Sequence, residues 1–110
     1  MSEILYFPER SEVRAELSGE LDHCSARNIR SAVDLELMKR LPCTLVIDLS
    51  RLSFMDSSGI GLIIGRYKLM QELGGRVVIE GASPGIAKLL RLAGISKLCS
   101  IRSCEGGIRV

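Results

Sequence analysis

The sequence predicts a single α/β domain, residues 1–110, with a central mixed β-sheet packed by three or more helices. Apolar, β-branched segments alternate with segments of helical periodicity, in the order β-β-α-β-α-β-α-β. A chain of 110 residues is long enough to bury one core. Strand–helix–strand units place their strands in parallel, whereas the first two strands are close enough in sequence to form an antiparallel hairpin.

The first part of the chain contains three expected strands and one helix. EILYF (3–7) and VRAELSG (13–19) flank the turn-forming residues PERSE, which favours a hairpin. A helix is expected from Ser25, placed as its N-cap, to Arg40. CTLVIDL (43–49) is almost continuously apolar, which is typical of a central strand covered on both faces. The expected inward face of the helix consists of Ala26, Ile29, Val33 and Leu37.

The second part of the chain continues the alternation of helices and strands. A helix is expected over 58–73, a strand over 76–82, a helix over 83–94 and a last strand over 98–102. In the 83–94 segment, SP supplies a serine cap and a proline at the first helical position. The inward side of the 58–73 helix is expected to carry Ile60, Ile63, Ile64, Tyr67 and Met70, and that of the 83–94 helix Ile86, Leu89, Leu90 and Ala93.

Composition and charge argue against several classes of function. The 15 basic and 13 acidic residues form no basic tract, so no direct nucleic-acid partner is expected. The longest apolar run, around residues 60–64, is too short to span a bilayer, and no charged-then-apolar leader begins the chain. A soluble cytoplasmic protein without a membrane partner is expected.

The cysteines and the single histidine are poorly suited to form a metal site. Cys24, Cys43, Cys99 and Cys104 form no C-x-x-C pair, and His23 is the only imidazole. We therefore expect no metal and no cofactor, and buried or half-buried thiols in a reducing compartment.

Chemistry-bearing residues follow three of the predicted strands. The loops GELDHC (19–24), SFMDSS (53–58) and EGAS (80–83) should emerge at the same end of the sheet, where open sheets place binding sites. The sequence therefore predicts that the side chains of Asp22, Asp56, Ser57 and Ser58 lie close together.

FMDSSGIG (54–61) does not match a catalytic serine, and it matches a dinucleotide site only in part. A nucleophile elbow needs G-x-S-x-G, which is absent around both serines. Gly59, Gly61 and Gly65 resemble a glycine fingerprint, with Glu80 as the acid that would bind a ribose. The fingerprint requires a strand that runs straight into the first glycine, whereas SRLSFMD separates the predicted strand from it.

Two further interpretations of the serines stay open. Asp56 or Ser57 caps the following helix, and the second serine is surplus to that need. Alternatively, one serine is a regulated phosphoacceptor. A phosphate there would meet free helix N–H groups and would add about −1.5 to −2 charges beside Asp56 and Asp22.

Three segments together resemble the STAS domain proteins, the anti-sigma factor antagonists. These are GELDHCSA, TLVIDLSRLSFMDSSGIGLIIGRYKLM and GASPGIAKLLRLAGI, and they cover nearly the whole chain. Within the family, LSFMDSSGIG followed by GRYK is more similar to the sporulation antagonists of the anti-sigma-F factor than to the general-stress antagonists. The resemblance implies the STAS fold.

The resemblance also implies a partner-switching protein that is not an enzyme. The unphosphorylated form binds an anti-sigma factor that is itself a serine kinase, and this frees a sigma factor for transcription. The kinase then inactivates the antagonist by phosphorylating the first serine of D-S-S/T-G, here Ser57, and a serine phosphatase restores it. Asp22 and Asp56 match acids that flank the phosphoacceptor. The residues expected to contact the partner are Asp22, His23, Asp56, Ser58 and Gly59. A small nucleotide-binding domain and a constitutive STAS-like scaffold remain the alternatives.

Overall fold

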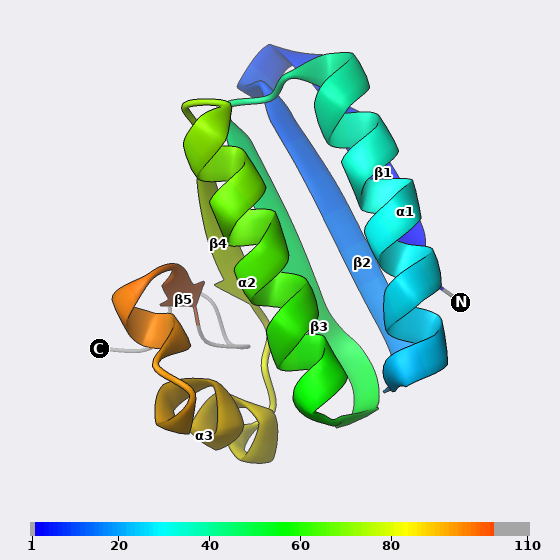
Figure 1. Cartoon of the computed structure of the whole chain (residues 1–110), viewed down its shortest axis with the longest axis vertical. Coiled ribbons are helices and arrows are strands. Elements are labelled where there is room, and N and C mark those ends of the chain that lie inside the picture. Colours follow the sequence, from blue (N-terminus) through cyan, green and yellow to red (C-terminus); the bar gives the residue numbers. More distant parts are fainter. Residues whose placement is uncertain (1, 103–110) are drawn as a thin grey trace.

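The computed structural model describes residues 2–102, which form a mixed five-stranded sheet and three α-helices (Figure 1). The strands are β1 (Glu3–Phe7), β2 (Glu12–Leu21), β3 (Thr44–Met55), β4 (Arg76–Glu80) and β5 (Ser100–Arg102), and the helices are α1 (His23–Arg40), α2 (Ser57–Glu72) and α3 (Pro84–Leu92). The order in the sheet is β1-β2-β3-β4-β5, with β1 antiparallel to β2 and the other pairs parallel. The predicted fold class is confirmed.

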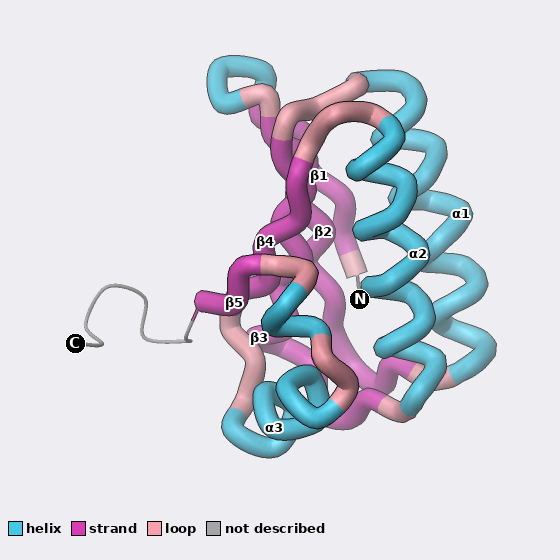
Figure 2. Tube along the Cα trace, turned by 60° about the vertical axis from the view of Figure 1, so that its left-hand side comes forward, coloured by secondary structure: helices cyan, strands magenta, loops and turns pink. Residues whose placement is uncertain are grey.

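The helices and the sheet form two layers around one core. Figures 1 and 2 show α1 and α2 side by side across one face of the sheet, with α3 beside the N-terminal end of α2. Side chains on a strand alternate between faces, and the helix-facing set is fully buried. In the strands this set includes Val13, Ala15, Leu17, Leu45, Ile47, Leu49, Val77 and Ile79, and α1 contributes Ala26, Val33 and Leu37.

The opposite face of the sheet carries a row of acids held by arginines. Glu16, Asp48 and Glu80 are neighbours in register across β2, β3 and β4, an arrangement of like charges that is destabilising by itself. Arg14 contacts carboxylate oxygens of all three, at 3.3, 3.1 and 2.7 Å respectively, and Arg102 contacts Glu80 at 2.6 Å. Burial alone lowers the pKa of Arg14, but the hydrogen bond and charge of Glu80, with the charge of Asp48, raise it on balance. Two arginines thus offset most of the charge of the three acids, and both carboxylate oxygens of Glu80 are engaged.

Two predicted boundaries at the edge of the sheet were wrong. Helix α1 begins at His23, and its N-cap is Asp22 rather than Ser25. Ser25 is instead the third helical residue, and its hydroxyl accepts the N–H of Asp22 at 2.9 Å to complete a capping box. Strand β3 does not end at Leu49 but runs on to Met55, pairing with β2 through two register shifts.

The inward face of α2 also differs from the prediction. The helix begins at Ser57 and buries Leu62 and Arg66, whereas Ile60, Ile64 and Tyr67 are only partly buried. The guanidinium of Arg66, on a residue 7% exposed, contacts a carboxylate oxygen of Asp34 at 2.8 Å. This ion pair joins α2 to α1.

The remaining differences lie near the C-terminal end and at the cysteines. Ser83 caps α3 as predicted, although Ala93 is exposed, and the last strand is shorter than expected. Cys24 and Cys43 are exposed, contrary to the prediction, whereas Cys99 is buried and burial raises the pKa of its thiol to about 11. Cys104 lies outside the described residues. No helix in the described part of the chain combines the length and apolar character needed to cross a bilayer.

Candidate functional site

Two neighbouring strands end side by side and present an aspartate each. Leu21 and Met55, the last residues of β2 and β3, are partners in register. Asp22 and Asp56 follow them, and the N–H of Asp56 donates to the carbonyl oxygen of Leu21 at 3.3 Å. Their backbone angles nearly coincide, with φ −111° and ψ −172° at Asp22 and φ −106° and ψ −167° at Asp56. The structure thus brings the two acids to one edge of the sheet, as the sequence predicts.

Each aspartate caps the helix that follows it. Oδ1 of Asp22 accepts the N–H of Ser25 at 3.0 Å, and Oδ1 of Asp56 accepts the N–H of Ser58 at 2.8 Å. The predicted cap on α2 is therefore confirmed, with Asp56 as the capping residue. Hydrogen bonds from the N–H and then the hydroxyl of Ser25 lower the pKa of Asp22, so this side chain is held as a carboxylate. Each aspartate thus caps a helix and also places a negative charge at this edge of the sheet.

Asparagine and alanine substitutions separate these two roles. We expect Asp22→Asn and Asp56→Asn to fold as the wild type does, because asparagine caps helices as well as aspartate. Asp22→Ala and Asp56→Ala should each lower the free energy of unfolding by about 1 kcal/mol. Urea denaturation followed by circular dichroism measures both effects. Asparagine variants as unstable as the alanine variants would show that the charge, not the cap, stabilises the fold.

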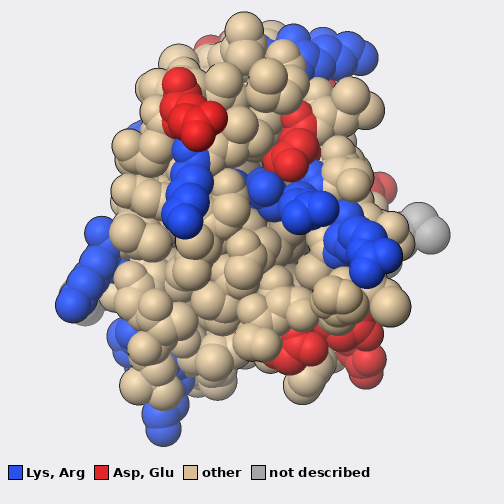
Figure 3. All heavy atoms as spheres, in the orientation of Figure 1, with Lys and Arg blue, Asp and Glu red and all other residues tan. Residues whose placement is uncertain are grey.

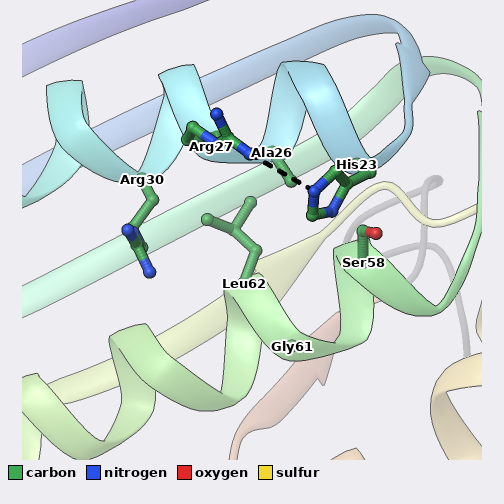
Figure 4. Close-up of a pocket in the computed structure, with 7 residues that line it drawn as sticks. All are labelled: His23, Ala26, Arg27, Arg30, Ser58, Gly61 and Leu62. Atoms are coloured by element: carbon green, nitrogen blue, oxygen red, sulfur yellow. Dashed lines mark hydrogen bonds between the residues drawn. The ribbon is translucent and has the colours of Figure 1, made fainter.

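The two serines of the motif face different surfaces. Ser57, the first residue of α2, is exposed and lies in an apolar groove whose other lining residues include Phe54 and Ile60. Helix α3 supplies the far side of this groove with Leu89 and Leu92. The groove includes exposed apolar side chains, since Phe54 is 49% and Leu92 77% exposed. Ser58 is half-buried and lines a separate cleft between α1 and α2 (Figure 4).

The donors at the start of α2 are already partly occupied. The N–H of Ser58 donates to the Asp56 carboxylate, and the N–H of Gly59 donates to the Asp56 carbonyl oxygen at 3.0 Å. The sequence predicted that a phosphate on this turn would meet free N–H groups, and for these two groups that was wrong. A phosphate on Ser57 would instead lie close to the Asp56 carboxylate, where like charges repel.

Gly59 has a packing role at the same turn. A Cβ at this position would lie 2.3 Å from Cγ of Met55 and 3.0 Å from Cδ2 of Leu21. The missing side chain therefore lets α2 begin directly against the ends of β2 and β3. Gly61 and Gly65 differ, because a Cβ there would meet nothing within 4 Å.

The structure does not form a dinucleotide fingerprint. The sequence argument rested on a gap between strand and glycines, and this reason was wrong, since β3 reaches Met55 and only Asp56 precedes α2. Even so, Gly59 and Gly61 lie inside α2, and the carboxylate of Glu80 is engaged by two arginines. Among the residues that the structure describes, no group of histidines, cysteines and acids is placed to hold a metal ion.

Comparison with known proteins agrees with this fold. Residues 11–106 match the STAS domain family. The anti-sigma F factor antagonist of Paenibacillus polymyxa is 39% identical over 89 residues, which cover 81% of this chain and 76% of that protein. The solved structure of the anti-sigma factor antagonist SpoIIAA in its unphosphorylated form has a TM-score of 0.81 at 30% identity, covering 96% of this chain and 90% of that one. The phosphorylated form of SpoIIAA has a TM-score of 0.74 at 30% identity and covers 96% and 94% of the two chains.

The chain therefore belongs to the STAS domain family. Within this family it groups with the anti-sigma factor antagonists, and it resembles SpoIIAA in both sequence and fold.

Proposed function

We propose that this protein is a phosphorylation-controlled partner switch. Its unphosphorylated form binds an anti-sigma factor that is also a serine kinase, and binding frees a sigma factor to activate transcription. Phosphorylation of Ser57 ends the interaction, and a serine phosphatase restores it. The protein acts by binding and not as an enzyme, and it works in the cytoplasm with its partners. Relatives named anti-sigma F factor antagonist support a sigma factor of sporulation as the one released.

One observation carries this proposal. Ser57 is exposed at the start of α2, on the rim of a groove that exposes Phe54 and Leu92. Exposed apolar side chains that cluster in this way are typical of protein-binding surfaces. A phosphate at that rim changes the charge of the surface without entering the core. SpoIIAA, which has the same fold, has been solved in both phosphorylated and unphosphorylated forms.

Intact-mass analysis with the cognate kinase tests the proposal. The protein is incubated with the anti-sigma factor, ATP and Mg²⁺, and we expect the mass to increase by one phosphoryl group. Peptide mapping should place the phosphate on Ser57, because its side chain is exposed, whereas Ser58 is half-buried. Ser57→Ala should stay unmodified while still binding the kinase.

Two results would contradict different parts of the proposal. Phosphate on Ser58, with Ser57→Ala still modified, would overturn the choice of serine. Absence of any complex with the anti-sigma factor would overturn the switch itself and leave the scaffold alternative.

A further inference from the structure

A cleft opens between α1 and α2, separate from the apolar groove at Ser57, and its α1 wall carries two arginines. Its volume is about 460 Å³, and its lining includes His23, Arg27 and Arg30 of α1 with Ser58 and Gly61 of α2. In Figure 4, Arg27 and His23 are in contact on α1, Ser58 and Leu62 face them from α2, and Arg30 extends toward α2. Figure 3 shows basic side chains over the region between the two helices, with acidic side chains beside them.

The arginines of this cleft lack acidic partners. Within residues 2–102, neither Arg27 nor Arg30 forms an ion pair with a carboxylate, and no carboxylate lines the cleft. Arg27 contacts the Nε2 atom of His23 at 3.4 Å. Burial lowers the pKa of Arg66, the charge of Asp34 opposes this effect, and the charge of Arg30 lowers the pKa further. Arg30 therefore lies close to a second cation, Arg66, whose own charge is paired with Asp34.

Arg27 lies near the positive end of the α1 helix dipole, because it follows one turn after His23, the first residue of the helix. The first turns of α1 and α2 contain no acidic residue, although each helix has an aspartate N-cap, Asp22 and Asp56 respectively. A basic side chain near this end of a helix is unfavourable, and a bound anion would offset its charge.

Small residues line part of the cleft on both helices. A Cβ at Gly61 would meet nothing within 4 Å, so no packing contact in the described structure requires glycine there. Glycine inside a helix is unfavourable relative to alanine, and its effect at this position is to leave space above the α2 backbone. Ala26 lines the same cleft from α1.

We propose that this cleft binds the phosphate group of inorganic phosphate or of a small phosphomonoester. Arg27 and Arg30 supply the compensating charges, and the Ser58 hydroxyl supplies a further hydrogen bond. Two guanidinium groups match a dianion with three free oxygen atoms better than a single carboxylate, because a phosphate can accept paired hydrogen bonds from each arginine. The cleft has a lining distinct from that of the groove at Ser57, although it includes His23 and Ser58, which the family resemblance places among the residues that contact the partner.

An NMR titration of the full-length, unmodified protein with inorganic phosphate at constant ionic strength tests the site. We expect saturable shifts of amide signals in the N-terminal halves of α1 and α2. Arg27→Gln and Arg30→Gln should each weaken binding by about tenfold, since charge-assisted hydrogen bonds are lost. Lys39→Gln removes the same charge from an exposed position near the other end of α1 and should leave the affinity unchanged.

A second pair of variants tests the space in the cleft. Gly61→Leu should fill it and abolish phosphate binding, whereas Gly65→Leu, one turn further along α2 and outside the lining, should bind as the wild type does. Both variants should fold, because a Cβ at either position meets no other atom within 4 Å. Circular dichroism checks this.

Three outcomes would overturn the proposal. These are shifts that do not saturate, equal affinities for Gly61→Leu and Gly65→Leu, and acetate binding as tightly as phosphate. Titration with O-phospho-L-serine separates the two sources of the phosphate group. If O-phospho-L-serine binds more tightly than inorganic phosphate, the ligand is a phosphomonoester. If it binds more weakly, the ligand is free phosphate.

Discussion

Phosphorylation of Ser57 is expected to weaken binding of the anti-sigma factor by about a hundredfold or more. The phosphate brings about −1.5 to −2 charges to the rim of a groove that must lose water when a partner docks. The Asp56 carboxylate already accepts the N–H of Ser58, so the phosphate cannot use that donor without displacing it. Like charges a few ångströms apart cost several kcal/mol when partly buried, and each 1.4 kcal/mol is about tenfold in affinity.

Substitutions at Ser57 should reproduce parts of this effect. Ser57→Asp carries about one negative charge and a smaller volume than the phosphate, so its affinity should fall between those of the two natural forms. Ser57→Ala should bind the kinase and escape inactivation, which leaves the sigma factor free. Calorimetry with the kinase measures these affinities. Ser31→Asp, an exposed position on α1 remote from the groove, is the control for added charge and should bind as the wild type does.

The structural effect of the phosphate should be local. Ser57 is exposed at the surface groove, so amide chemical shifts should change only around the start of α2 and the groove. Equal affinity for the wild type, Ser57→Asp and the phosphorylated form would reject the electrostatic switch. Shift changes throughout the sheet would reject its local character.

Gly81→Ala should lower the free energy of unfolding by about 3 kcal/mol. Gly81 has φ +74°, a left-handed conformation that side chains with a Cβ disfavour. Its Cβ would also lie 2.7 Å from Cβ and 3.1 Å from Cα of Ser50 on β3. The second distance involves backbone, so the loop that joins β4 to α3 would have to move.

Gly74→Ala is the matched control for this prediction. Gly74 has φ +80°, but a Cβ there would meet nothing within 4 Å, so only the conformational cost of about 1–2 kcal/mol should appear. Urea denaturation of the two variants gives the difference between them. Equal destabilisation would show that the approach to Ser50 contributes nothing.

The fold class was predictable because its signals are local. The serine and proline at the start of α3, the alternation in β2 and the buried central strand can each be read from a few neighbouring residues. The end of β3 could not be read in this way. Its pairing with β2 shifts register between Glu16 and Ser18 and again between Gly19 and Glu20, so the alternation that marks a strand is interrupted. The residues from Ser50 onward consequently resembled a loop.

The candidate site was predictable only where strand ends place residues together. Parallel strands end at one edge of a sheet, and this rule predicted that Asp22, Asp56 and Ser57 lie close together. Their functional roles stay predictions. The cleft residues Arg27 and Arg30 had no such signal, because they face Ser58 only once α1 and α2 pack side by side.

Arg66 and Leu92 were overlooked for opposite reasons. Arg66 falls at helical spacing with the buried Leu62 and Met70, which could have indicated a buried cation on α2. Leu92 resembled an ordinary residue of an amphipathic helix, and its exposure beside Ser57 depends on where α3 docks.

The order of the strands also bears on how the protein is made. Each strand pairs with the one that precedes it in the chain, so every strand that leaves the ribosome meets a partner that already exists. The two aspartate-capped junctions can form as soon as β3 and α2 have been synthesised. The side of the groove supplied by Leu89 and Leu92 arrives only with α3, so a nascent chain presents Ser57 before the surface beside it is complete.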